Sequence, residues 1–139
     1  MSEDFPTLTD VGYNKDMETT EEIEDMRKAL IALQEARNLI VEKGWTQNFY
    51  ARNADGVNVC IGSKEATCYC AMGAMHTAFH LIAIPCETNW DILALTKLEN
   101  ELPEGNKSIP YFNDLPETTA KDIQGMFDRA ITKLEAQLQ

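Results

Sequence analysis

The stretch from Thr19 to Trp45, TTEEIEDMRKALIALQEARNLIVEKGW, constrains the fold more than any other part of the sequence. Thr19 or Thr20 can cap a helix here, and Glu22 follows Thr19 at the spacing of a capping box. Apolar residues then recur every three to four positions, which is typical of one helix face packed on a core. Gly44 suits the position just past the helix end. The stripe consists of Ile23, Met26, Leu30, Leu33, Arg37 and Ile40, widened by Ala29, Ala32, Ala36 and Leu39.

The next segment, NFYARNADGVNVCIG, changes from the helical period to alternation. Asn, Asp and Gly in NADG tolerate the backbone of a tight reversal. The pattern therefore predicts a short β-hairpin that pairs Asn48–Arg52 with residues 57–61. Because an isolated hairpin is only marginally stable in water, we expect it to pack on a helix.

Three further helices follow in the pattern. The first spans about residues 64–83 after the capping residue Ser63 and is ended by Pro85; the second begins at Trp90, in WDILALTKLENEL. The proline-rich stretch PEGNKSIPYFNDLP reads as a long structured loop, and Thr118 or Thr119 caps the last helix, AKDIQGMFDRAITKLEAQL. We predict a mainly α protein with about four helices and a short hairpin between the first two. The predicted domains are an acidic arm, residues 1–18, and one helical domain, residues 19–139.

The net charge of −11 is concentrated near the N-terminus, because residues 1–25 carry nine acidic residues and one lysine. This charge disfavours binding to nucleic-acid phosphates and to anionic membranes, and it favours a protein partner with a basic surface. No apolar run has the ~20 residues that a membrane helix needs, and no secretory pattern opens the chain. The sequence predicts a cytoplasmic protein with free thiols and no cofactor. The acidic residues expected to contact a partner are Asp16, Glu18, Glu21, Glu22, Glu24 and Asp25.

The stretch ATCYCAMGAMHTAFH is where a metal site would be sought first. His76 and His80 share a helix face, but Thr77 follows His76 where the known metalloprotease pattern has glutamate. The spacing of Cys68 and Cys70 does not match the Cys-x-x-Cys pairs of structural zinc sites. We therefore predict no metal ligands.

The same stretch offers two other interpretations. Cys70 and His76 are six residues apart, which places them about 120° out of register on a helix, so the helix alone does not form a thiol–imidazole pair. A triad completed by Asp114 from the long loop is the remaining possibility. Cys70, Gly73 and Ala74 form a small-residue face, and Gly73 in a helix predicts the close approach of another backbone. The second interpretation is the stronger one, and His76 and His80 remain open as core-edge or ligand-facing residues.

The stretch SIPYFNDLPETT is the other candidate region. Asn113 and Asp114 lie between aromatic residues and a proline, where they can stabilise a turn. With Tyr111 they are also candidate partner-binding residues on an exposed loop. Catalytic residues are not assigned.

Several of these motifs occur together in a known family. The order EKGW, ARNADG, EATCYCAMGAMHTAF, IPYFND and DIQGMFDRAI resembles a family of small helical proteins of unknown function found in bacteriophages and some bacteria, over roughly residues 27–132. The resemblance depends on Trp45, Asp55, Gly56, the Ala66 to Ala74 segment with Cys70 and Gly73, and Asn113–Asp114.

The resemblance implies a viral source and assigns no activity. The leading hypothesis is a phage-encoded acidic protein that engages and modulates or inhibits a host protein, one that handles nucleic acid or defends the cell. One alternative is a small thiol- and histidine-dependent enzyme or ligand-binding protein. The other is a homo-oligomeric structural or virion-associated protein, a homo-dimer being the simplest case.

Overall fold

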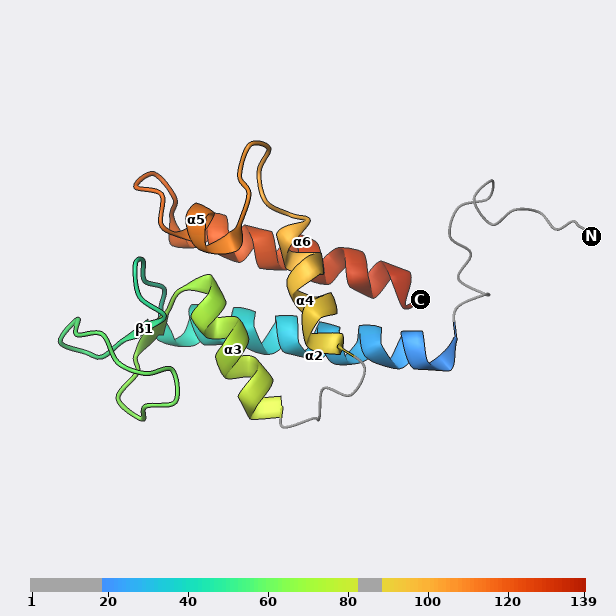
Figure 1. Cartoon of the computed structure of the whole chain (residues 1–139), viewed down its shortest axis with the longest axis horizontal. Helices are drawn as coiled ribbons and strands as arrows, with labels where there is room; N and C mark the ends of the chain where they lie inside the picture. The colour runs from blue at the N-terminus through green and yellow to red at the C-terminus, as the bar shows by residue number, and fades with distance from the viewer. Residues whose placement is uncertain (1–18, 83–88) are drawn as a thin grey trace, which may run out of the picture.

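The computed structural model describes residues 19–82 and 89–139 and is mainly α-helical, as predicted (Figure 1). A two-stranded antiparallel sheet lies between the first two described helices. In the described ranges, no helix is long and apolar enough to cross a membrane. The elements are α2 (Thr20–Lys43), β1 (Ala51–Arg52), β2 (Cys68–Tyr69), α3 (Ala71–Ile82), α4 (Trp90–Glu99), α5 (Ile109–Asn113) and α6 (Ala120–Gln137).

Helix α2 has the boundaries that its sequence predicts. The Thr19 hydroxyl accepts a hydrogen bond from the Glu22 backbone N–H, and the Glu22 carboxylate accepts one from the Thr19 N–H, so the capping box is confirmed. At the other end Gly44 follows the helix with φ of 133°, which a residue with a side chain rarely adopts. Both ends of α2 are therefore fixed by local sequence.

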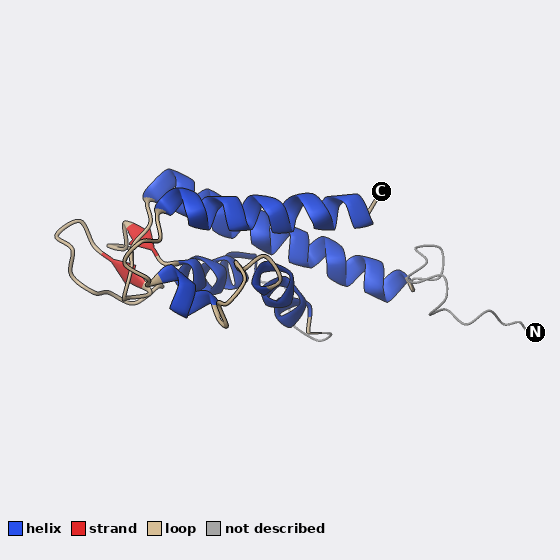
Figure 2. Cartoon of the chain, turned by 90° about the horizontal axis from the view of Figure 1, so that it is seen from above, coloured by secondary structure: helices blue, strands red, loops and turns tan. Residues whose placement is uncertain are grey.

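The core forms where α3, α4 and α6 pack on the apolar stripe of α2. Helices α2 and α6 run lengthwise in opposite directions, as both views show (Figures 1 and 2). The Thr119 hydroxyl caps α6, also in a capping box, which confirms that prediction. The largest fully buried side chains are Trp90, Phe127, Leu33, Met75, Leu98, Ile123, Met126, Leu134 and Asn113.

The sheet differs from the predicted hairpin in its second strand. Ala51 and Arg52 pair with Tyr69 and Cys68, whereas the predicted segment 57–61 contributes only a single bridge, between Arg52 and Asn58. The NADG turn itself forms, and the Asn53 side chain accepts hydrogen bonds from the N–H groups of Asp55 and of Val57, which follows the turn. The physical reason is burial, because the side chain of Tyr69 enters the core while Val57 stays exposed.

Helix α3 begins at Ala71, seven residues later than predicted. Ser63 does not cap a helix; its hydroxyl accepts from the Glu65 N–H within a local turn. Cys70 takes the capping role instead, since its carbonyl accepts from the Ala74 N–H and its Sγ accepts from the Gly73 N–H at 3.2 Å. Pairing of Cys68 and Tyr69 with β1 keeps the preceding residues out of the helix.

The segment after α4, which the prolines led us to predict as a loop, contains a short helix, α5. The Ser108 hydroxyl caps it by accepting from the Tyr111 N–H, and Pro110 lies in the first turn, where a missing N–H costs nothing. Helix α4 ends at Glu99, three residues before the predicted end. Residues 83–88, which include the predicted stop Pro85, and the predicted arm, residues 1–18, lie outside the described residues.

Candidate functional site

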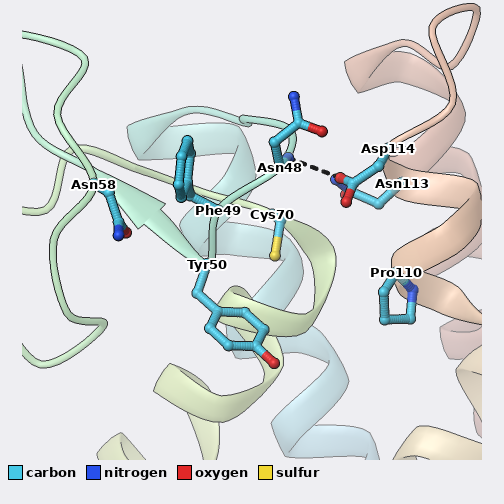
Figure 3. Close-up of a pocket in the computed structure, with 8 residues that line it drawn as sticks. All are labelled: Asn48, Phe49, Tyr50, Asn58, Cys70, Pro110, Asn113 and Asp114. Carbon is cyan, nitrogen blue, oxygen red and sulfur yellow. Dashed lines mark hydrogen bonds between the residues drawn. The ribbon is translucent and has the colours of Figure 1, made fainter.

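A pocket of about 370 Å³ is lined by the segment before β1, by Cys70 just before α3, and by residues of and next to α5. These elements lie at the end of the molecule where α2 finishes (Figure 1). Figure 3 shows Asp114 and Pro110 on one side, Tyr50 and Asn58 on the other, and Cys70 between them. Its volume is in the lower range of small-ligand sites. The lining residues are Asn48, Phe49, Tyr50, Asn58, Cys70, Pro110, Asn113 and Asp114.

Asn113 holds this end of the molecule together. Its side chain is 1% exposed, and Oδ1 accepts hydrogen bonds from Trp45 Nε1 at 2.8 Å and from the Ala71 N–H at 2.9 Å. Its Nδ2 donates to the Thr46 carbonyl and to Asp114 Oδ1. One buried amide therefore uses all of its bonding capacity to join α5 to the start of α3 and to the loop after α2.

Two neighbours of Asn113 fix the loop that forms the pocket rim. The Gln47 side chain donates to the carbonyls of Asn113 and Leu115, at 3.0 and 2.7 Å. Asp114 Oδ1 accepts from the Asn48 N–H at 2.8 Å, and Asn48 has a positive φ of 74° (Figure 3). These contacts hold the Asn48 backbone in a conformation that most residues avoid.

Gly73 lets the backbone of the Tyr50 loop, which forms one wall of the pocket, lie close to α3. A Cβ at Gly73 would lie 2.0 Å from the carbonyl oxygen of Tyr50, and this carbonyl accepts a hydrogen bond from the Cys70 N–H. The prediction that another backbone approaches Gly73 is thus confirmed. The approaching backbone belongs to the loop that carries Tyr50 and not to another helix.

Cys70 is 7% exposed and lies at the pocket floor. Burial raises the pKa of its thiol, and the Asp114 carboxylate adds to this, whereas N–H groups at the start of α3 act in the opposite direction. A cysteine at a helix N-terminus often has a lowered pKa, but here burial outweighs that effect. Cys70 is consequently a protonated, poorly nucleophilic thiol at neutral pH.

We expect Cys70 to react at least about tenfold more slowly than the exposed Cys60 with a disulfide reagent at neutral pH, because the rate follows thiolate fraction and access. Two variants, each with a single cysteine, allow the comparison. Both carry Cys68→Ser and Cys86→Ser; adding Cys60→Ser leaves Cys70 alone, and adding Cys70→Ser leaves Cys60 alone. Release of the chromophore gives each rate. In denaturant the two thiols should react alike; a native Cys70 as fast as Cys60 would contradict this account.

The histidines do not join Cys70 or Asp114. The His76 ring makes T-shaped contacts with Tyr50 and Phe79, at centroid distances of 6.1 and 6.0 Å, and His80 is exposed. Within residues 19–82 and 89–139, no hydrogen bond joins His76 to Asp114, and no three His, Cys, Asp or Glu side chains could hold a metal ion. His76 therefore packs at the edge of the core.

The residues predicted to bind a partner lie in two separate places. Tyr111 and Asp114 are exposed beside the pocket, whereas Asn113 is buried and positions the others. The acidic residues start at the opposite end of α2, whose 24 residues span about 36 Å (Figure 1). Asp16 and Glu18 lie outside the described residues; Glu21, Glu22, Glu24 and Asp25 occupy the first turns of α2.

Sequence reasoning did not single out Asn48, Phe49, Tyr50 or Asn58 as site residues. Phe49 and Tyr50 were assigned to a strand, where aromatic residues are common. In the structure both precede the strand and remain exposed. The available signal was the pair of aromatic residues immediately after a helix end, next to a turn.

The fold and the pocket describe a small helical protein in which the segment before β1 and the short helix α5 line a recess at one end. The chain belongs to the family of unknown function DUF6197, whose model matches residues 25–133. This confirms the family resemblance seen in the sequence motifs. Neither a curated protein nor a solved structure matches the chain.

Proposed function

We propose that this chain is a phage-encoded binding protein that engages a host protein with a basic surface and modulates or inhibits it. The contact is made by the loop-end surface, defined here as the exposed residues around the pocket: Phe49, Tyr50, Pro110, Tyr111 and Asp114. The phage source is inferred from the family resemblance. The binding role is inferred from the surface.

The observation that carries the proposal is the exposure of aromatic side chains on a rigid frame. Tyr50 is 57% exposed and Tyr111 60% exposed, while the buried Asn113 amide fixes the segments on which both are placed. Aromatic residues are enriched in protein interfaces, where they bury large areas at low entropic cost. A surface that is already ordered loses little freedom on binding, which favours affinity.

The charge distribution supports a basic partner. Asp114 contributes a carboxylate next to the aromatic residues, and the start of α2 adds a second acidic region at the other end of the molecule. Because the two regions are far apart, we assign direct contact to the loop-end surface and long-range attraction to the acidic helix start. Electrostatic attraction of this kind mainly raises the association rate.

The alternative of a thiol- and histidine-dependent enzyme is less well supported. A nucleophilic cysteine needs a lowered pKa or a base within hydrogen-bond distance. The pKa of Cys70 is raised, and His76 contacts two aromatic rings. Binding therefore accounts for the pocket better than catalysis.

Affinity capture from an extract of host bacteria tests the proposal. The full-length chain is immobilised as wild type and as Tyr50→Ser/Tyr111→Ser. We expect wild type to retain one predominant protein and the double variant to lose it at least about tenfold, as for interface aromatic residues. The measurement is the amount retained, by quantitative mass spectrometry.

The matched control removes two equally exposed apolar side chains elsewhere, in Leu81→Ser/Ile92→Ser; these residues are 61% and 56% exposed. The control should retain the same protein as wild type. Circular dichroism confirms that all three chains fold. A protein retained equally by the three chains, or no retained protein at all, would count against the proposal.

A further inference from the structure

The pocket at the loop-end surface carries a negative charge. Among its eight lining residues Asp114 is the only acidic or basic residue, and burial raises the pKa of the Cys70 thiol, which keeps it protonated. Asp114 is therefore the single charged side chain that lines the pocket at neutral pH. An anionic ligand would meet this carboxylate unfavourably, whereas a cation would be attracted to it.

The two oxygens of the Asp114 carboxylate differ in their hydrogen bonds. Oδ1 accepts from the Asn48 N–H and from Asn113 Nδ2, at 2.8 and 2.9 Å. Oδ2 accepts no hydrogen bond from any residue in the described ranges. The orientation of the group is thus fixed through one oxygen while the other remains available.

Further acceptors surround the recess. The side-chain amides of Asn48 and Asn58 line the pocket and make no hydrogen bonds to the part of the chain that the structure describes. Figure 3 shows these two amides and Asp114 distributed around the opening, with the Tyr50 ring at one side. Acceptors in several directions suit a ligand with several N–H donors better than one with a single donor.

Aromatic rings at this end of the molecule already accommodate a guanidinium group. Arg52 lies over the Phe49 ring with its Cζ 4.5 Å from the centroid, and it donates to the carbonyls of Gly56 and Gln47. Arg52 does not line the pocket. Of the two rings that line the pocket, Phe49 already contacts Arg52, so Tyr50, which is exposed, offers a second such contact. Guanidinium groups stack on aromatic faces more readily than ammonium groups.

From these contacts we propose that the pocket receives an arginine side chain of the partner protein, with the guanidinium bound to Asp114 Oδ2 and stacked on Tyr50. This inference rests on the proposed function and specifies its partner chemistry. It accounts for a lining that combines one carboxylate, amide side chains and two aromatic rings. The remainder of the partner then covers the loop-end surface.

The test is an NMR titration of the full-length chain with N-acetyl-arginine methylamide. We expect saturable shifts of the backbone amides of Asn48, Tyr50 and Asp114. The neutral isostere N-acetyl-citrulline methylamide and N-acetyl-lysine methylamide should bind at least about tenfold more weakly, because citrulline lacks the charge that Asp114 attracts and lysine lacks the planar group that stacks on Tyr50. Equal binding of either analogue would overturn the assignment of a guanidinium site.

Variants locate the site. Asp114→Asn keeps an oxygen for the Asn48 N–H but removes the charge, and it should weaken arginine binding about tenfold. Tyr50→Leu, which removes the stacking face, provides a second variant should Asp114→Asn fail to fold. The control Glu117→Gln removes a charge from an exposed residue outside the pocket and should change nothing.

If a folded Asp114→Asn or Tyr50→Leu chain binds arginine as wild type does, the proposed site is wrong. The outcome is separate from that of the capture experiment. A partner lost with Tyr50→Ser/Tyr111→Ser, in a protein that shows no arginine binding, would support the interface and reject the arginine pocket.

Discussion

Asn113→Ala is expected to lower the free energy of unfolding by about 3–5 kcal/mol, the largest effect of any single polar substitution considered. The truncation leaves Trp45 Nε1, the Ala71 N–H and the Thr46 carbonyl without their partner. Each buried group without a partner costs about 1–3 kcal/mol. Chemical denaturation followed by circular dichroism gives the value.

Asn100→Ala is the matched control, because Asn100 is exposed and makes no side-chain hydrogen bond within the described residues. We expect it to change the free energy of unfolding by less than about 0.5 kcal/mol. An Asn113→Ala chain as stable as Asn100→Ala would show that the buried amide does not hold the loop end together.

Gly73→Ala is expected to cost about 2–3 kcal/mol, although alanine is the better helix former by about 1 kcal/mol. The new methyl group would lie 2.0 Å from the Tyr50 carbonyl oxygen and 2.8 Å from the carbonyl carbon. Both are backbone atoms, so relief requires α3 and the Tyr50 loop to move apart. The same denaturation measurement reports the cost, and amide shifts at Asn48 and Tyr50 report the movement.

Gly125→Ala provides a control of opposite sign in another helix. A Cβ there meets only the end of the Arg129 side chain, at 3.3 Å, and no backbone atom. We expect Gly125→Ala to stabilise the protein by about 0.5–1 kcal/mol through helix propensity. If Gly73→Ala were also stabilising, the close approach of the Tyr50 loop would be disproved.

The elements that the sequence predicts well are those fixed by local physics. The periodicity and capping box of α2, and the Thr119 cap of α6, involve residues a few positions apart. The start of α3 was missed because Cys70 is not among the usual capping residues. Helix α5 was missed because the three prolines of the segment 103–116 suggested a loop, although Pro110, the one proline in the helix, is compatible with its first turn.

The site was predictable only in part, because its contacts join distant positions. The sequence marks Asn113 as a turn or partner residue, yet three of its four side-chain partners are 42 to 68 residues away in the sequence. Gly73 correctly indicated a close backbone, but nothing in its spacing identifies the loop that carries Tyr50. Composition predicts a basic partner, and the sequence offers two contact regions, the acidic residues near the N-terminus and the loop with Tyr111, Asn113 and Asp114, without a physical reason to choose between them.

The central claim is that the loop-end surface, and not the acidic start of α2, makes the contact with the partner. Amide hydrogen exchange of the chain, alone and with the captured partner, tests it most directly. We expect protection on binding at residues 47–52 and 110–115, with little change at residues 20–26. Protection confined to residues 20–26, with exchange at the loop end unchanged, would contradict the claim.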